Sequence, residues 1–206
     1  MTVLSEILPG IFSWPQYSDE KEMNFNGYYL LHGGESVIID PPDLDETGMK
    51  ELETLISENS THPLKAILLT NVHHDRMSLG LKAKWSLPIY IHEKDRELLE
   101  FVPDATFQGG DTPVCGLKVI HLENQKSPGE SAFLLEARKI LIVGDALIGK
   151  IPGKVNLLPP DKYRDIRKAK EGLRILKDYD FESILVGDGE PILTRARQVV
   201  MEFLES

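Results

Sequence analysis

Residues 65–80 read KAILLTNVHHDRMSLG and join an apolar run to a polar segment that contains two adjacent histidines. It opens with the apolar run AILL at residues 66–69, which is short and aliphatic enough to form a buried strand. The run stops at Thr70, and the polar residues NVHHDR follow directly. Because α/β sheets place their ligands at the carboxyl ends of strands, the adjacent His73 and His74 predict a functional site at this point.

The composition is that of a globular chain. Its 206 residues are 41% hydrophobic and 27% charged, which suits one domain covering residues 1–206. There is no apolar run of about 18 residues and no basic segment followed by an apolar one at the start, so neither a membrane span nor a secretory signal is expected. The single cysteine, Cys115, excludes an internal disulfide and is typical of a reducing compartment, which predicts a cytoplasmic protein.

The net charge limits the partners. The chain has 23 Lys and Arg residues against 33 Asp and Glu residues, which gives a formal charge of −10. Such a chain repels nucleic acid and anionic membranes over most of its surface, so neither is an expected partner. A small-molecule ligand remains compatible with this charge. A homodimer is also compatible with the fold class, because exposed sheet edges favour association between copies.

Apolar segments and turn residues predict sheets covered by helices. Early strands lie in hairpins, as at residues 4–14, whereas later strands alternate with helices. Asp43 or Asp45 is expected to cap the first helix. Further helices are expected over about residues 93–102 and from Pro191 onward. This mixture is typical of a layered α/β or α+β domain.

Polar residues recur just after apolar strands, in an order that resembles one known family. The segments are IID at 38–40, LLT at 68–70, SPG at 127–129, GDAL at 144–147 and GDGEP at 187–191. Their order and spacing, from about residue 26 to residue 191, resemble the metallo-β-lactamase fold family. The resemblance implies a four-layer αββα sandwich whose strand-end loops build a one- or two-metal hydrolase site.

The metal motifs of that family are only partly present. The motif T-H-x-H-x-D-H corresponds to residues 70–76, where His73 and Asp75 match, and the family's bridging aspartate corresponds to Asp145. The other histidines of the family are replaced by Asn71, Arg76, Lys126 and Asp188. Three of the seven family ligands therefore remain, and only one of them is a histidine.

The replacements favour a site without a metal. Arg76 stays protonated and a charged Lys126 has no lone pair, so both place positive charge where a metal would bind. We expect ion pairs with Asp75, Asp145 and Asp188 in place of the metal. The protein would then be a pseudoenzyme without a cofactor. It would be either structural or able to hold an anionic ligand, such as a phosphate or carboxylate, on Arg76 and Lys126.

A rearranged one-metal site is the alternative. Its ligands would be His73, His74, Asp145 and Asp188. Glu130 is a further candidate donor, and this oxygen-rich set suits Mn or Fe at least as well as Zn. A bound ion would activate water for hydrolysis of a small ester, thioester or lactone-like substrate, with Asp75 or Glu130 as the candidate carboxylate base.

The sequence indicates less clearly what the residues around the metal motifs do. Asp40 is expected either to orient a histidine of the site or simply to end its strand, and Asn71 is expected to support the site without binding a metal. Glu130 either reaches the cavity or caps a loop, and both interpretations stay open. The histidines at positions 32, 62 and 92 are expected in solvent. Cys115 is expected to be a structural or surface thiol rather than a nucleophile.

Overall fold

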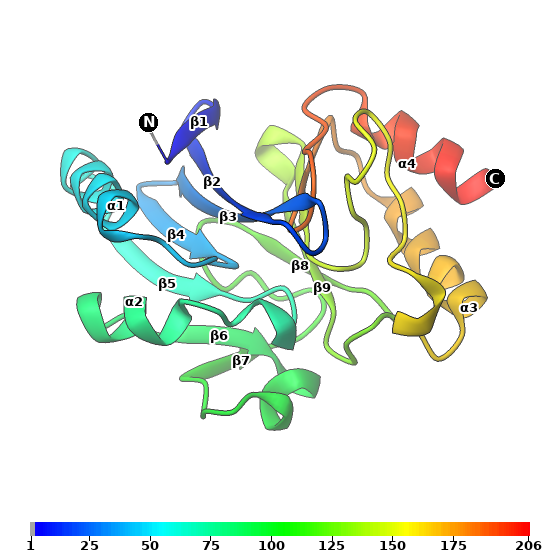
Figure 1. The fold of residues 1–206 in the computed structure, drawn as a ribbon, viewed down its shortest axis with the longest axis horizontal. Coiled ribbons are helices and arrows are strands. Elements are labelled where there is room, and N and C mark those ends of the chain that lie inside the picture. The colour runs from blue at the N-terminus through cyan, green and yellow to red at the C-terminus, as the bar shows by residue number, and fades with distance from the viewer. Residues whose placement is uncertain (1–2) are drawn as a thin grey trace.

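The structure, a computed structural model, describes residues 3–206 and contains two facing sheets (Figure 1). One sheet has seven strands in the order β1-β2-β3-β4-β5-β6-β7. Its strands are β1 Ser5–Leu8, β2 Ile11–Ser18, β3 Met23–His32, β4 Glu35–Ile39, β5 Leu64–Leu68, β6 Ile89–His92 and β7 Ala105–Phe107. The other sheet has the order β11-β10-β9-β8. Its strands are β8 Lys118–His121, β9 Ser131–Leu135, β10 Ile140–Val143 and β11 Ser183–Val186.

Helices cover the outer face of each sheet. The larger sheet is covered by α1 (Glu46–Glu58) and α2 (Ser78–Trp85), and the smaller sheet by α3 (Ile166–Gly172) and α4 (Ala196–Glu205) (Figure 1). Short 3-10 turns are η1 Val72–His74, η2 Glu93–Leu98, η3 Glu136–Arg138, η4 Pro160–Lys162 and η5 Leu173–Asp178. The predicted αββα sandwich is therefore confirmed. Among residues 3–206, no helix has the length and apolar character needed to cross a membrane.

Alternating side chains along the strands fill three apolar layers. In β4, Val37 and Ile39 lie in the layer between the sheets, while Ile38 packs in the layer beneath α1 and α2. In β10, Ile142 faces the layer between the sheets and Leu141 faces α3 and α4. Because both faces of these strands are buried, their sequences are continuous apolar runs rather than alternating ones.

The strands that precede the polar loops run parallel to a neighbour. β5 pairs in parallel with β4 and β6, and β10 pairs in parallel with β11. The end of β11 is also tied to the other sheet. The side-chain amide of Asn26 donates to the carbonyls of Val186 (2.9 Å) and Gly189 (2.8 Å), and the Tyr28 hydroxyl donates to that of Val186 (2.7 Å). These contacts hold the carboxyl end of β11 against the amino-terminal half of β3, which lies beside the carboxyl end of β4.

Two predicted helices are shorter in the structure. Over residues 93–102 only the turn η2 forms, because the backbone becomes extended at Leu99, with ψ of 147°. From Pro191 the chain first folds back on β11, where Ile192 and Ile184 exchange backbone hydrogen bonds, and α4 begins only after this bridge. In both places tertiary contacts and backbone geometry prevailed over the apolar pattern.

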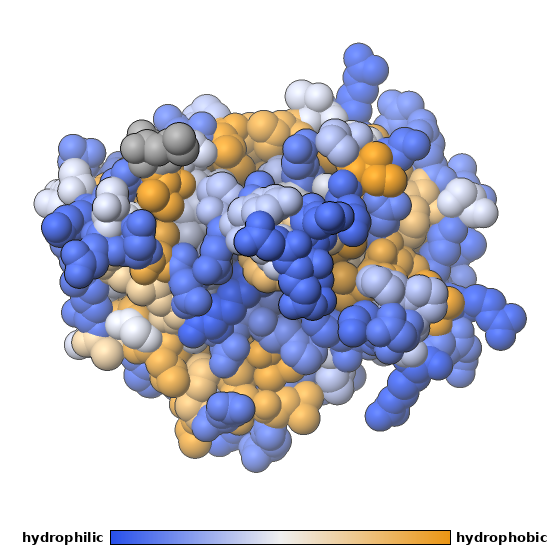
Figure 2. All heavy atoms as spheres, in the orientation of Figure 1, coloured by the Kyte–Doolittle hydropathy of each residue, from blue (hydrophilic) through white to orange (hydrophobic). Residues whose placement is uncertain are grey.

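The face of the molecule drawn in Figure 2 is mostly hydrophilic, in line with the acidic composition. Apolar residues gather at the lower edge of this view, around β6 and β7 (Figures 1 and 2). In the segment between these strands, Leu98 is 52% exposed and Val102 is 75% exposed. Leu98 borders a cavity that it shares with His73 and Lys126, so this apolar segment reaches the neighbourhood of the strand-end loops.

Candidate functional site

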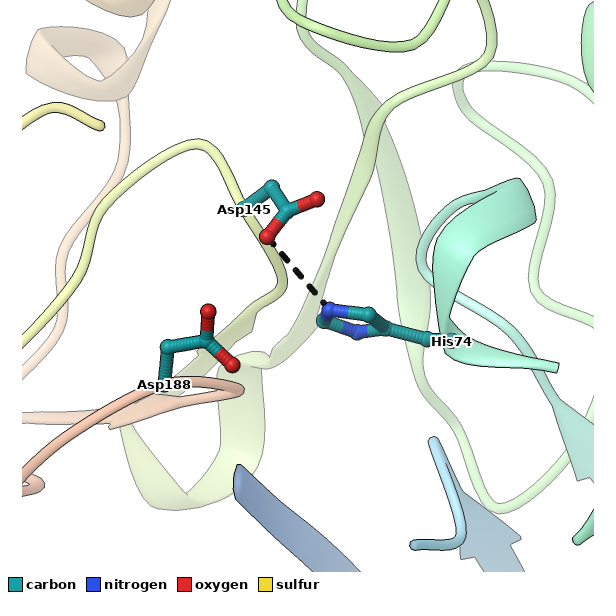
Figure 3. Close-up of side chains that lie close together, drawn as sticks. All are labelled: His74, Asp145 and Asp188. Atoms are coloured by element: carbon teal, nitrogen blue, oxygen red, sulfur yellow. Dashed lines mark ion pairs between the residues drawn. The ribbon is translucent and has the colours of Figure 1, made fainter. Parts of the chain in front are cut away.

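Polar side chains from separate segments meet at the strand ends. Asp40 follows β4, His74 lies in η1 after β5, Asp145 follows β10 and Asp188 follows β11. His74, Asp145 and Asp188 approach one another, and each offers an atom within 4.8 Å of those offered by the other two (Figure 3). All three residues are buried. They form the centre of the candidate site.

His74 lies between two carboxylates. Its Nδ1 is 2.8 Å from Oδ2 of Asp40, and its Nε2 is 3.5 Å from Oδ1 of Asp145. Thr70 holds Asp40 in place, because its backbone nitrogen donates to Oδ1 at 2.8 Å and its hydroxyl donates to Oδ2 at 2.6 Å. Burial opposes the charged form of His74, but Asp40 and Asp145 outweigh it and raise the pKa of the imidazole to about 10. At neutral pH His74 is therefore an imidazolium.

Two further cations contact the carboxylates of the site. Nζ of Lys126 lies 2.7 Å from Oδ2 of Asp145, and Nη2 of Arg76 lies 3.6 Å from Oδ1 of Asp188. Burial opposes ionisation of Asp145, yet His74 and Lys126 outweigh it and hold its pKa well below the usual value. Burial dominates at Asp188 and raises the pKa of that carboxyl. The two cationic residues that replace family histidines, Arg76 and Lys126, thus lie against the two aspartates of the site.

Arg76 is placed by a strained backbone and by an aromatic ring. Its φ of +25° lies in a region that L residues rarely adopt. Its guanidinium carbon is 5.0 Å from the centroid of the Phe25 ring, which is a cation–π contact. Within residues 3–206, the guanidinium donates no hydrogen bond and the carboxylate of Asp188 accepts none. The two groups are paired by charge alone.

The site opens into a cavity of about 650 Å³. The cavity is bordered by the turn between β2 and β3, by the loop after β10 and by the strand ends. Its apolar wall includes Met23, Phe25, Ile148, Leu157 and Leu158. Its cationic side chains are Lys21, Arg76, Lys126, Lys150 and Lys162. A concave, largely apolar volume with a few charged groups at one end is the usual form of a small-molecule site.

Glu130 lies beneath the site rather than in the cavity. Its side chain is fully buried, and Oε1 accepts hydrogen bonds from the Asn71 amide at 3.2 Å and the Ala146 backbone nitrogen at 3.3 Å. Burial and the nearby charge of Asp145 raise its pKa well above the usual value, which favours the protonated, uncharged form. Gly144 is required beside it, because a Cβ there would lie 2.2 Å from Oγ1 of Thr70. Glu130 does not line the cavity, which leaves it poorly placed as a base for a ligand bound there.

The structure separates the two histidines that the sequence placed together. Both belong to η1, and consecutive residues of a 3-10 turn point in different directions. His74 is buried in the site, whereas His73 is exposed and lies at the cavity mouth, outside the group of three converging ligands. Asp75 also stays apart: its Oδ1 accepts from the Arg76 backbone nitrogen at 2.8 Å, and within residues 3–206 it makes no ion pair with Arg76 or Lys126.

Asp95 is a supporting residue that the sequence did not reveal. Its buried carboxylate accepts hydrogen bonds from the backbone nitrogens of Val72 (3.0 Å) and Gly129 (2.6 Å) and from the hydroxyl of Ser127. It therefore joins the loop that carries His74 and Arg76 to the loop that carries Lys126. No local motif signals this role, because the partners are far apart in the chain.

His92 and Cys115 both lie outside the site. His92 was expected in solvent, but it is only 2% exposed and stacks on His121 with ring centroids 4.4 Å apart. Cys115 is buried, and burial raises the pKa of its thiol to about 12, which fits a structural role.

Comparisons with known proteins agree with the architecture. A family model described as the metallo-beta-lactamase superfamily matches residues 3–206. The chain resembles a metallo-beta-lactamase from Pontibacter korlensis, with a TM-score of 0.78 and 19% identity over 98% of this chain and 96% of that chain. A metallo-beta-lactamase from Erythrobacter litoralis gives a TM-score of 0.75 and 18% identity over 98% of this chain and 95% of that chain.

A metallo-beta-lactamase family protein from Thermus thermophilus gives a TM-score of 0.68 and 22% identity over 97% of this chain and 80% of that chain. A search of curated proteins finds no match. At these identities the solved structures show a shared fold and nothing about chemistry. The family match, in contrast, covers the whole described chain, and the protein belongs to the metallo-beta-lactamase superfamily.

Proposed function

We propose that this protein is a metal-independent member of its superfamily that binds a small anionic ligand in the strand-end cavity. The observation that carries the proposal is the pair of contacts between Lys126 and Asp145, at 2.7 Å, and between Arg76 and Asp188, at 3.6 Å. In the family motifs Arg76 and Lys126 stand where metal-binding histidines are expected. Here each cation lies against an aspartate that would otherwise serve as a ligand.

The charge balance of the site supports this proposal. Three carboxylates, those of Asp40, Asp145 and Asp188, face three cations. The cations are His74, Arg76 and Lys126. Burial raises the pKa of Glu130 and so favours its uncharged form. The cluster is therefore balanced by side chains alone.

The residues present do not fit a divalent metal. An added ion would have to displace the proton of His74 and the contacts of two fixed cations, and like charges at such short range repel strongly in a poorly hydrated site. The converging donors are the imidazole of His74 and the carboxylates of Asp145 and Asp188. Each of the two carboxylates already lies against a side-chain cation. The proposed function therefore includes no chemical step at a metal.

An anion is the ligand class that the cavity favours. Five Lys or Arg side chains line it, and Lys150 makes no ion pair with any residue in the described part of the chain. Arg76 combines a fork of N–H donors with the aromatic support of Phe25, which suits a carboxylate or phosphate. The apolar wall suits a ligand whose remainder is hydrophobic.

A hydrolase with one metal is the second candidate function. Two observations favour it: the convergence of His74, Asp145 and Asp188 within 4.8 Å, and the contact of 2.8 Å between Asp40 and Nδ1 of His74, which leaves Nε2 directed at the site. A carboxylate behind a histidine is a common support for a metal ligand. Its substrate would be a small ester, thioester or lactone.

Metal content separates the two candidates. Protein purified without chelator and incubated with Zn, Mn or Fe is expected to hold well below one ion per chain by elemental mass spectrometry. Nearly one ion per chain, lost in both His74→Ala and Asp145→Ala, would overturn the proposal and establish the second candidate. Ligand binding is tested separately: hexanoate or inorganic phosphate should raise the melting temperature of the parent protein and not that of Arg76→Gln. Arg174→Gln, which changes an exposed arginine paired with Glu171, is the matched control.

A further inference from the structure

The hydrogen-bonding capacity of two charged groups at the cavity wall is left unused by the protein. Asp188 is 7% exposed, and Arg76 has 17% of its side chain exposed; both line the cavity. Among residues 3–206 neither side chain makes a hydrogen bond, and Oδ1 of Asp188 and Nη1 of Arg76 are buried without a partner. Buried charged groups in folded proteins are nearly always hydrogen-bonded. Because both side chains line the cavity and keep part of their surface exposed there, a ligand is expected to bond to the part of each group that faces the cavity.

The other carboxylates of the site differ from Asp188 in this respect. Asp40 accepts hydrogen bonds from the backbone and hydroxyl of Thr70, and Asp145 accepts one from Lys126. Asp188 therefore stands out as the acceptor that remains available to a ligand. Arg76 is the corresponding donor, since Lys126 is already engaged with Asp145.

The spacing of these two groups restricts the ligand. The carboxylate of Asp188 and the guanidinium of Arg76 are neighbours, because Oδ1 and Nη2 are 3.6 Å apart. A ligand that bonds to both groups from the cavity must carry an anionic acceptor for Arg76 and a hydrogen-bond donor for Asp188 on neighbouring atoms. A hydroxyl on the carbon next to a carboxylate meets this requirement, whereas a plain carboxylic acid leaves Asp188 without a donor.

A charged donor is less suitable than a hydroxyl. An ammonium group next to Asp188 would also lie close to Arg76, Lys126 and His74, all of which are cationic. A hydroxyl donates to the carboxylate without adding a fourth positive charge. The apolar side chains Met23, Phe25 and Leu158 then provide a surface for the hydrocarbon part of the ligand.

We propose that the cavity recognises a 2-hydroxy carboxylic acid with an apolar chain, whose carboxylate binds Arg76 and whose hydroxyl donates to Asp188. This inference rests on the proposed function, because it assigns the chemical class of the anion that the cavity would bind. Discrimination between a hydroxy acid and the matching plain acid comes from Asp188, and affinity for either acid comes from Arg76.

The test compares four probes of equal chain length by isothermal titration calorimetry: 2-hydroxyhexanoate, hexanoate, norleucine and 1,2-hexanediol. The parent protein should bind 2-hydroxyhexanoate about tenfold more tightly than hexanoate, which corresponds to about 1.4 kcal/mol. The diol should not bind measurably. This comparison uses the parent protein alone, so it remains decisive if a variant does not fold.

Variants then assign the preference to a residue. Asp188→Asn should reduce the preference for 2-hydroxyhexanoate over hexanoate to about twofold or less, while Arg76→Gln should weaken both acids. Glu22→Gln changes another carboxylate that lines the cavity and should leave the preference unchanged.

Each result decides a different claim. Equal binding of hexanoate and 2-hydroxyhexanoate by the parent would overturn the hydroxyl assignment while leaving anion binding intact. Tighter binding of norleucine would overturn it in favour of an ammonium group. Binding of neither acid would overturn the proposed function itself.

Discussion

The ammonium nitrogen of Lys126 lies 2.7 Å from Oδ2 of Asp145, although the family motif leads one to expect a histidine and an aspartate that share a metal at these positions. A second pair, Arg76 and Asp188, lies 3.6 Å apart at two positions where the family motif has histidines. In each case a fixed side-chain cation contacts the carboxylate. Stability of this site should therefore depend on side-chain charge rather than on added ions.

Removal of Lys126 should destabilise the fold. Lys126→Ala leaves Asp145, which is only 3% exposed, without its ammonium partner. We expect the free energy of unfolding to fall by about 1–3 kcal/mol, less than for a fully buried pair because Lys126 is itself 25% exposed. Urea denaturation at neutral pH measures the change. Lys150→Ala, which removes a lysine from the same cavity, is the control and should change stability little.

Return of histidines should create affinity for zinc. In the double variant Arg76→His with Lys126→His, two cations leave the site and two imidazoles join His74, Asp145 and Asp188. We expect nearly one zinc ion per chain by elemental mass spectrometry, against far less in the parent protein. Addition of Asp145→Ala should abolish the gain. A folded double variant that holds no zinc would show that charge replacement does not explain the site.

Protonation of His74 should make stability depend on pH. The pKa of His74 is raised to about 10 in the folded protein, against about 6.5 in an unfolded chain. A raised pKa means that the folded state holds the proton more tightly, so the stabilisation is complete below about pH 6.5 and is lost as the pH rises toward 10. Urea denaturation from pH 6 to pH 9.5 should show this decline in the parent protein. His74→Gln should lack this decline. If stability fell equally steeply with pH in the variant and the parent protein, the imidazolium assignment would be contradicted.

Glu130 should oppose folding at neutral pH. Burial raises its pKa well above the usual value, so the folded state must take up a proton that the unfolded chain has released above about pH 4.5. Its contribution to stability is therefore complete below that pH and is lost as the pH rises. Glu130→Gln keeps the shape and an oxygen for Asn71 without the ionisation. The variant should gain stability over the parent protein as the pH rises from 4.5 to 8.

If the difference in stability between Glu130→Gln and the parent protein did not change with pH, Glu130 would be ionised in the folded protein. Glu136→Gln, at an exposed carboxylate paired with Lys118, is the control and should show no such trend. Thermal unfolding followed by circular dichroism at several pH values provides the measurement.

The layers and the polar segments of this protein are both readable from its amino-acid pattern. Continuous apolar runs such as residues 66–69 and 140–143 specify strands buried on both faces, and the turn residues that follow place acids and histidines at the strand ends. The replacement of family histidines by Arg76 and Lys126 is also visible in the sequence. Chemistry alone then excludes these residues as metal ligands.

Which of these residues come into contact depends on how the chain packs in three dimensions. His73 matches the family motif, yet the 3-10 turn directs its neighbour His74 into the site, and a one-residue difference in direction cannot be read from spacing. The partners of Arg76 and Lys126 come from other strands, so their distances depend on how the two sheets pack. The raised pKa of Glu130 likewise follows from complete burial, a property of the assembled layers rather than of any local sequence.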